Sequence, residues 1–321
     1  MTVTLRSYRH PEDFSRVGSF LVETYQPLRQ PSNWLQPRWE YMHYLCVPFF
    51  GLTRADLERI GIWEDQGRIV GVVHFEARLG QAYFQEHPDY PHLKADMLDY
   101  AEANLSALSP DGEWSLRAFV RDSDHQFESI VRARGYCENK DAGECMSRLD
   151  LRTPLPVAAI PDGFRVKSQA EDDDRVKINR VLHRGFDHPG EPPESQLEVR
   201  RRLEEAPHFR KELVIVAESP QGDFVSYCGV WYENDNRFAL VEPVATDPAF
   251  RGLGLGRVCV LEALRRATEI GATVAYVGTD MPFYLSFGFK RMSACRAWQK
   301  SWTAGRDDIR PQQEKLGPDT R

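Results

Sequence analysis

The chain lacks the features that would place it in a membrane, a secretory pathway or a metal-binding class. None of its 321 residues belongs to an apolar run long enough to cross a bilayer, and the N-terminal stretch has no apolar signal region. The six cysteines include no C-x-x-C pair and match no zinc or disulfide spacing, so we expect most to be reduced. These absences predict a cytoplasmic protein with no membrane partner.

The chain also has fewer basic than acidic side chains. There are 41 Lys and Arg against 48 Asp and Glu, a net charge of −7. This balance argues against nucleic-acid binding, which needs a basic face, and is compatible with a cationic acceptor. His183, Asp187 and His188 lie close together as metal ligands would, but no further ligand is suitably spaced, and we predict no metal. No Ser-His-Asp or Cys-His arrangement supports a covalent mechanism.

An internal repeat divides the chain into two units of ordinary domain size. Arg16-Val17 recurs as Arg175-Val176, 159 positions later, and Leu5-Arg6 recurs as Phe164-Arg165 at the same offset. The repeat predicts two copies of one α/β unit, separated by a proline-rich linker. The expected boundaries are a first domain at 1–152, a linker at 153–162, a second domain at 163–303 and a polar tail at 304–321.

The most specific pattern runs from Ala239 to Ile270. An apolar, β-capable segment leads into a glycine-rich loop, and an amphipathic helix follows. The loop has a glycine at every second position, namely Gly252, Gly254 and Gly256. Glycines tolerate positive φ and place no Cβ in front of the unpaired amides of a helix N-terminus, so such a loop can hold an anion. A glycine-rich turn that only reverses the chain is the alternative.

Two common phosphate loops are excluded by the residues after the glycines. Gly256 is followed by Arg257-Val258 where a Walker loop needs Lys-Ser or Lys-Thr, and Cys259 stands where a dinucleotide fingerprint needs a small residue. The remaining pattern is Arg-x-x-Gly-x-Gly, from Arg251 through Gly254 to Gly256. With Pro243 and Pro248 before it, this pattern resembles the acetyl-CoA pyrophosphate loop of the GCN5-related N-acetyltransferases, the GNAT superfamily.

The resemblance extends to residues further along the chain. Tyr284 stands four residues before Gly288-Phe289, as does the tyrosine that faces the CoA sulfur in that family. Only a short segment precedes Tyr284, where the family often has an Asn-rich helix. The resemblance implies two tandem GNAT-like domains of class α/β (α+β), each a mixed, mostly antiparallel sheet flanked by helices. This two-domain layout is similar to that of the mycothiol synthases.

The resemblance also implies a set of site residues. Acetyl-CoA, as co-substrate, is expected to be bound by Val244, Ala245, Thr246, Arg251, Gly252, Leu253, Gly254, Leu255, Gly256 and Arg257. An amide near Val244 or Ala245 would stabilise the developing oxyanion. Pro243 is expected to separate this strand from the next, which opens a slot for the pantetheine arm. Tyr284 would protonate the departing thiolate, and Glu242 is either the general base or one partner of a structural salt bridge.

The predicted function is therefore N-acetyl transfer from acetyl-CoA to the amine of a small-molecule or peptide acceptor by direct attack. The second copy would carry this activity. A non-catalytic CoA-binding or regulatory module, and an acyltransferase that uses another acyl-CoA, remain alternatives. The oligomeric state stays open. Acceptor pockets in this fold come from variable loops, so the sequence does not name the acceptor.

The first copy is expected to be degenerate. It has no glycine loop after Tyr90, and Val131 stands where the second copy has Tyr284. It also contains a dense aromatic segment, comprising Trp34, Trp39, Tyr41, Tyr44, Phe49 and Phe50. This segment is either a wall of an acceptor pocket or a part of the core and of the packing between domains, and the second interpretation is favoured.

Overall fold

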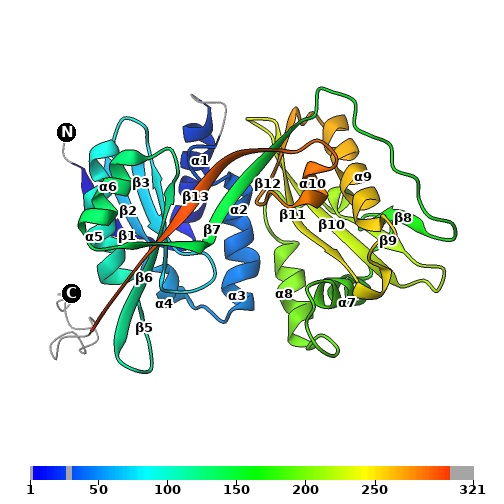
Figure 1. Cartoon of the computed structure of the whole chain (residues 1–321), viewed down its shortest axis with the longest axis horizontal. Coiled ribbons are helices and arrows are strands. Elements are labelled where there is room, and N and C mark those ends of the chain that lie inside the picture. Colours follow the sequence, from blue (N-terminus) through cyan, green and yellow to red (C-terminus); the bar gives the residue numbers. More distant parts are fainter. Residues whose placement is uncertain (1–2, 27–30, 304–321) are drawn as a thin grey trace.

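The computed structural model describes residues 3–26 and 31–303, so the polar tail predicted at 304–321 lies outside the described residues. Within them, thirteen strands form one continuous sheet with helices on both faces (Figure 1). The first half holds seven strands: β1 (Thr4–Ser7), β2 (Gly61–Asp65), β3 (Arg68–His74), β4 (Gln81–Glu86), β5 (Ala107–Leu108), β6 (Glu113–Arg121) and β7 (Cys137–Asp150). The second half holds six: β8 (Arg165–Ser168), β9 (Ile215–Glu218), β10 (Phe224–Glu233), β11 (Phe238–Thr246), β12 (Val274–Val277) and β13 (Lys290–Thr303).

The helices alternate with these strands along the chain. Those of the first half are α1 (Glu12–Tyr25), α2 (Gln36–Tyr41), a π-helical turn (Met42–Cys46), α3 (Val47–Phe49), α4 (Arg54–Leu57), α5 (Lys94–Asn104) and α6 (His125–Ala133). Those of the second half are α7 (Arg175–Gly185), α8 (Ser195–Leu203), α9 (Leu255–Glu269) and α10 (Pro282–Leu285). No helix in the described part of the chain is long and apolar enough to span a membrane.

The two halves repeat one strand order, which confirms the duplication read from the sequence. In the first half, β1, β2, β3 and β4 pair antiparallel in succession, and β6 then pairs parallel to β4. In the second half, β8, β9, β10 and β11 pair in the same way, and β12 runs parallel to β11. Each half is thus a mixed, mostly antiparallel sheet, as predicted.

Strand β10 lies at the centre of the second half and is buried along its whole length. Side chains of a strand alternate between its two faces, so the two faces need separate cover. Cys228 packs in the cluster that contains α9, whereas Tyr227 packs in the cluster that contains α7. The two helices therefore cover opposite faces and position the C-terminal end of β11 between them.

The last strands of the two halves are exchanged. Strand β7, which ends the first half, pairs with β12 of the second half, and β13, which ends the second half, pairs with β6 of the first. The two exchanged strands also pair with each other and join the halves into one sheet (Figure 1). The domain boundaries drawn from the sequence stay a prediction, but the hydrogen bonding of the sheet crosses them.

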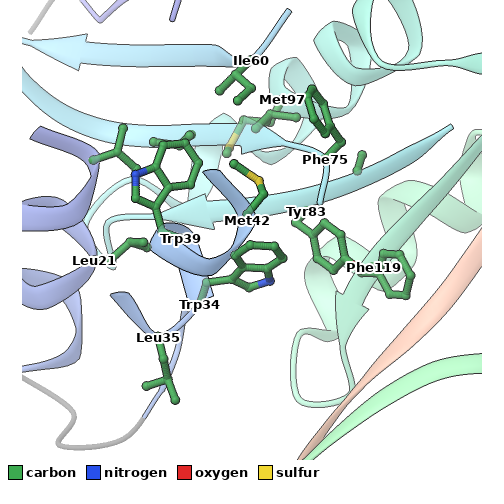
Figure 2. Close-up of a cluster of buried hydrophobic side chains, with 14 of the residues drawn as sticks. Leu21, Trp34, Leu35, Trp39, Met42, Ile60, Phe75, Tyr83, Met97 and Phe119 are labelled. Atoms are coloured by element: carbon green, nitrogen blue, oxygen red, sulfur yellow. The ribbon is translucent and has the colours of Figure 1, made fainter. Parts of the chain in front are cut away.

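The aromatic segment of the first half supplies much of its core. Figure 2 shows Trp34 and Trp39 beside Met42 and Tyr83 in the cluster of buried side chains. Trp39 is fully buried, and its indole N–H donates to the carbonyl of Phe14 over 3.1 Å. The favoured packing interpretation is confirmed for these two tryptophans.

Replacing Trp298 with alanine is expected to destabilise the first half from the far end of the chain. Trp298 lies on the exchanged strand β13, is 1% exposed, and belongs to the core cluster of the first half. Removing a large buried aromatic side chain costs about 3–5 kcal/mol of unfolding free energy. Urea denaturation followed by circular dichroism would measure the loss. Trp302→Ala on the same strand, where the side chain is only partly buried, is the control, and equal effects would contradict the prediction.

Candidate active site

The loop between β11 and α9 forms an open nest of backbone amides. Gly252 and Gly254 both have a φ of +82°, in the left-handed region that favours glycine, and Gly254 is the N-cap of α9. A Cβ added to either glycine would meet nothing within 4 Å, so both face open space. The first amides of α9 have no helical partner, and the helix dipole is positive at this end. The loop therefore suits a phosphate-sized anion.

The loop is held close to the end of β11. A Cβ on Gly256 would lie only 3.1 Å from Thr246 Oγ1, so the first turn of α9 approaches the strand as closely as glycine permits. Arg251 does not point into the nest. Its Nε donates to the carbonyl of Thr246 over 3.1 Å, its Nη2 donates to the carbonyl of Gly185 over 2.9 Å, and it forms an ion pair with Asp187. Arg251 thus braces the loop against β11 and the end of α7.

The other predicted loop residues differ in exposure. Leu253 is 48% exposed at the tip, whereas Leu255 is buried in the core of the second half. Arg257 turns toward α10, where its Nη1 donates to Ser286 Oγ over 3.3 Å and its guanidinium lies 5.2 Å from the ring centre of Phe287. Arg257 therefore connects the nest with the segment that carries Tyr284.

The pairing of β11 with β12 stops before the C-terminal part of β11. The parallel ladder between the two strands ends at Leu240 and Tyr276, before β11 reaches Pro243, and this end is compatible with the predicted separation of the two strands. The amide of Asp247 donates to the carbonyl of Val225 on β10. Antiparallel pairing alternates along the strand, so the Ala245 amide also faces β10 and that of Val244 faces the predicted slot. Val244 is thus an amide of β11 that points away from β10.

Glu242 lies on this same stretch of β11 and borders two cavities, of about 340 and 250 Å³. Burial is the main reason that the pKa of its carboxyl group rises from 4.5 to about 7. The charge of Arg38 lowers this pKa, and the charges of Glu76 and Glu144 raise it. No Lys, Arg or His in the described ranges lies within 4.0 Å of this carboxylate, so no salt bridge forms there. A carboxyl group with this pKa can take up a proton at neutral pH.

Tyr284 lies in α10. It is 8% exposed and packs against the rings of Phe283, Phe287 and Phe289. Burial raises the pKa of its hydroxyl group, and the charges of Cys228 and Glu242 raise it further. The phenol therefore remains protonated near neutral pH and can donate its proton or a hydrogen bond.

The first half contributes a residue to this site that sequence reasoning missed. Arg38, on α2, borders both cavities beside Glu242. Its guanidinium donates two hydrogen bonds of 2.7 Å to Glu76 and bonds of 2.9 and 3.0 Å to Glu144, and it lies 4.0 Å from the ring centre of Trp34. Arg38 is remote from the motifs along the chain, so no local pattern marks it.

The corresponding place in the first half presents charged side chains and also borders the cavity of about 250 Å³. Strands β4 and β6 separate after Tyr83, as β11 and β12 do, but α5 begins at Lys94 instead of following a glycine loop. Lys94 Nζ forms ion pairs of 3.1 Å with Glu86 and 2.7 Å with Asp124. The side chain of a buried lysine therefore stands where the second half presents open amides.

The family of the chain follows from this fold and from comparison with known proteins. Residues 210–291 match the family model described as "Acetyltransferase (GNAT) domain", and this range covers the nest, Glu242 and Tyr284. Residues 210–291 are therefore a GNAT acetyltransferase domain, and the duplicated fold gives the chain a tandem GNAT layout. The resemblance read from the motifs is confirmed.

Curated relatives of the chain include mycothiol acetyltransferases. That of Thermomonospora curvata is 31% identical over 199 residues, which make up 60% of this chain and 66% of the relative. That of Nocardia farcinica is 29% identical and covers 41% of this chain, and that of Rhodococcus erythropolis is 24% identical and covers 69%. The chain spans 66% and 46% of the lengths of the first two relatives, less than two thirds of each.

Solved structures match nearly the whole chain in fold. A GCN5-related N-acetyltransferase from Sphaerobacter thermophilus superposes with a TM-score of 0.64 at 15% identity, over 94% of this chain and 96% of that one. A tandem GNAT protein from the clavulanic acid biosynthesis pathway gives a TM-score of 0.61 at 14% identity, over 94% and 98%. These likenesses concern the fold alone, and they agree with two GNAT-like units in one chain.

Proposed function

We propose that the chain transfers an acetyl group from acetyl-CoA to the amine of a small-molecule or peptide acceptor, at a single site in the second half. The arrangement around the end of β11 carries this proposal. An open anion nest, a slot beside Val244, a carboxyl group with a pKa of about 7 and a protonated phenol come together there. The names of the curated relatives favour a small amine as the acceptor.

Each group has a distinct task in this proposal. The amides of the nest bind the pyrophosphate of the co-substrate, and the Val244 amide stabilises the negative charge that develops on the thioester oxygen. Glu242 removes a proton from the acceptor amine while the new C–N bond forms. Tyr284 supplies a proton to the sulfur as the C–S bond breaks. One proton is taken up and one is given, so the products are the amide and the free thiol.

The first half has a supporting role. Its slot borders a cavity but presents the ion pairs of Lys94 in place of a glycine nest, so we do not expect a second acetyl-CoA there. It instead completes the cavities beside Glu242 through α2 and the turn that follows it. The degenerate unit thus remains necessary as a wall of the active site.

Calorimetric titration of the full chain with acetyl-CoA tests the proposal. We expect one site per chain, followed by release of CoA when amines are added. Two sites would contradict the supporting role of the first half. Binding of acetyl-CoA without turnover of any amine in a broad panel would favour a CoA-binding module. Preferential binding of another acyl-CoA would favour a different donor. Absence of acetyl-CoA binding would overturn the proposal.

Tyr284→Phe is expected to lower kcat by about 10²-fold while leaving the dissociation constant of acetyl-CoA nearly unchanged. The hydroxyl group acts on the leaving thiolate, so its loss affects the chemical step more than binding. Steady-state kinetics and calorimetry together would separate the two quantities. Tyr136→Phe is the matched control, because Tyr136 is a buried tyrosine in the core of the first half. A Tyr284→Phe enzyme with unchanged kcat would remove this residue from the mechanism.

A further inference from the structure

The cavity of about 340 Å³ beside Glu242 lies between the two halves. On one side it is bordered by α2, the π-helical turn and α3 of the first half, and on the other by α7 and α8 of the second. Its volume lies in the range that holds a small organic molecule. The inference below rests on the proposed function and concerns the molecule that this cavity accepts.

The rim of the cavity is unusually apolar. Phe50 is 57% exposed and Phe186 is 49% exposed, and both border the cavity, one from each half. Phe49 and Leu182 continue the apolar lining inward. Aromatic rings of this size gain much from being covered, so their exposure at a cavity mouth points to an apolar or aromatic occupant.

Of the two arginines that border the cavity, only Arg200 lacks a carboxylate partner among the described residues. Arg38 is bound to two carboxylates, and Arg201 and Arg202, which follow Arg200 on α8, are paired with Glu198. Arg200 also borders the cavity, yet in the described part of the chain no carboxylate lies within 4.0 Å of its guanidinium. Its Nε donates a long hydrogen bond of 3.4 Å to Asn179 Oδ1.

This cation lies in the same enclosure as the proposed base. Tyr41 borders the cavity from α2. Burial raises the pKa of its hydroxyl group, the charge of Glu242 raises this pKa further, and the charge of Arg200 lowers it. The cavity thus presents a proton acceptor and an unpaired guanidinium around one aromatic enclosure. Guanidinium groups bind carboxylates through paired, charge-assisted hydrogen bonds.

We propose that the acceptor is a primary amine on an aromatic or similarly apolar body that also carries a carboxylate, which Arg200 binds while the amine faces Glu242. Amines of this class include apolar amino acids and amino-alkyl aromatic acids. Arg200 is then a specificity-determining residue that acts on binding of the acceptor rather than on the transfer step.

Matched pairs of amines test the proposal in an assay of CoA release by the full chain. Each pair has one member with a carboxylate and one without: phenylalanine and phenethylamine, tryptophan and tryptamine, and 4-(aminomethyl)benzoate and benzylamine. The pairs place the carboxylate at different distances from the amine. The wild type is expected to favour the carboxylate member of at least one pair by about 10–100-fold in kcat/KM.

Two substitutions on α8 decide what causes the preference. Arg200→Gln is expected to lower kcat/KM for the carboxylate member to about that of its partner and to leave the simple amine unchanged. Arg201→Gln is the matched control, because Arg201 is more than half exposed and paired with Glu198 and Glu205, and it should change neither member. Equal losses for both members in Arg200→Gln would contradict the role of Arg200.

Failure of this inference can be told apart from failure of the proposed function. If acetyl-CoA binds at one site per chain and the simple amines are acetylated better than every carboxylate member, the acceptor class is wrong and the function stands. The acceptor class is also wrong if acetyl-CoA binds but no member of the three pairs is acetylated. If acetyl-CoA itself does not bind, the proposed function is overturned.

Discussion

Replacing Glu242 with glutamine is expected to lower kcat/KM by about 10²–10⁴-fold, the range typical of the loss of a general base. Glutamine keeps the shape of the side chain but cannot accept the proton of the attacking amine. The loss should depend on pH. The wild-type rate is expected to rise through a pKa of about 7 as Glu242 ionises, and the variant should lack this step. A shared rise at higher pH, from deprotonation of the amine itself, would remain in both enzymes.

The same substitution is expected to change stability in the opposite direction. The pKa of Glu242 is higher in the folded chain than the usual 4.5, so folding takes up a proton between pH 4.5 and about 7. The wild type therefore loses stability as pH rises through this window, and the penalty is complete above pH 7. Glutamine has no such penalty, so the variant should be more stable by about 1–3 kcal/mol at pH 8 and equal to the wild type near pH 4. Urea denaturation at both pH values would measure the difference.

Glu86→Gln is the matched control for the kinetic effect. Glu86 lies in the slot of the first half, and burial raises the pKa of its carboxyl group as it does that of Glu242. We expect the turnover of this variant to equal that of the wild type. A pH profile that is unchanged in Glu242→Gln would exclude Glu242 as the base, whatever the size of the loss.

Replacing Gly254 with glutamate is expected to weaken acetyl-CoA binding by about 100-fold or more. The new carboxylate would stand in the open space that the nest presents to a phosphate, and juxtaposed like charges cost several kcal/mol. A side chain at a φ of +82° adds local strain. Calorimetric titration with acetyl-CoA would measure the affinity of the variant.

Gly222→Glu separates the effect of the site from that of backbone strain. Gly222 has a φ of +89° and open space around its Cβ position, but it lies in the turn between β9 and β10, away from the nest. The control carries the same strain and the same added charge, so it should bind acetyl-CoA as the wild type does. If the two variants bind equally well, the nest is not the pyrophosphate site.

The part of the site that could be predicted from the sequence is the part fixed by local spacing. The strand, the glycine loop and the helix from Ala239 to Ile270 fold as expected, because positive φ, missing Cβ atoms and helix amphipathicity are all local properties. The position of Tyr284 beside the nest likewise followed from its distance to Gly288. The roles assigned to these residues remain predictions.

The features of the fold and of the site that the sequence did not reveal depend on contacts between distant segments. The exchange of β7 and β13 left no local signal, because both strands carry mixed polar and apolar side chains that fit several partners. Arg38 lies in the first half and reaches the site only when the two halves pack together, Arg200 borders the cavity between the halves, and neither belongs to a motif. Arg251 was expected to bind acetyl-CoA, yet its side chain donates to the nearby carbonyls of Thr246 and Gly185. Each interpretation of the aromatic segment holds for a part of it. Trp39 belongs to the core, whereas Phe50 borders the cavity.

The exchanged strands also set an order of events during translation. Strand β6 ends at Arg121 and its partner β13 begins at Lys290, so at about 5–20 residues per second the ribosome needs roughly 10–30 s to make the segment between them. Throughout that interval the nascent first half has an unpaired sheet edge, which is a template for aggregation. The chain is therefore expected to rely on chaperones during synthesis, and a premature stop codon before Lys290 would leave the earlier-made half incomplete as well as the later one.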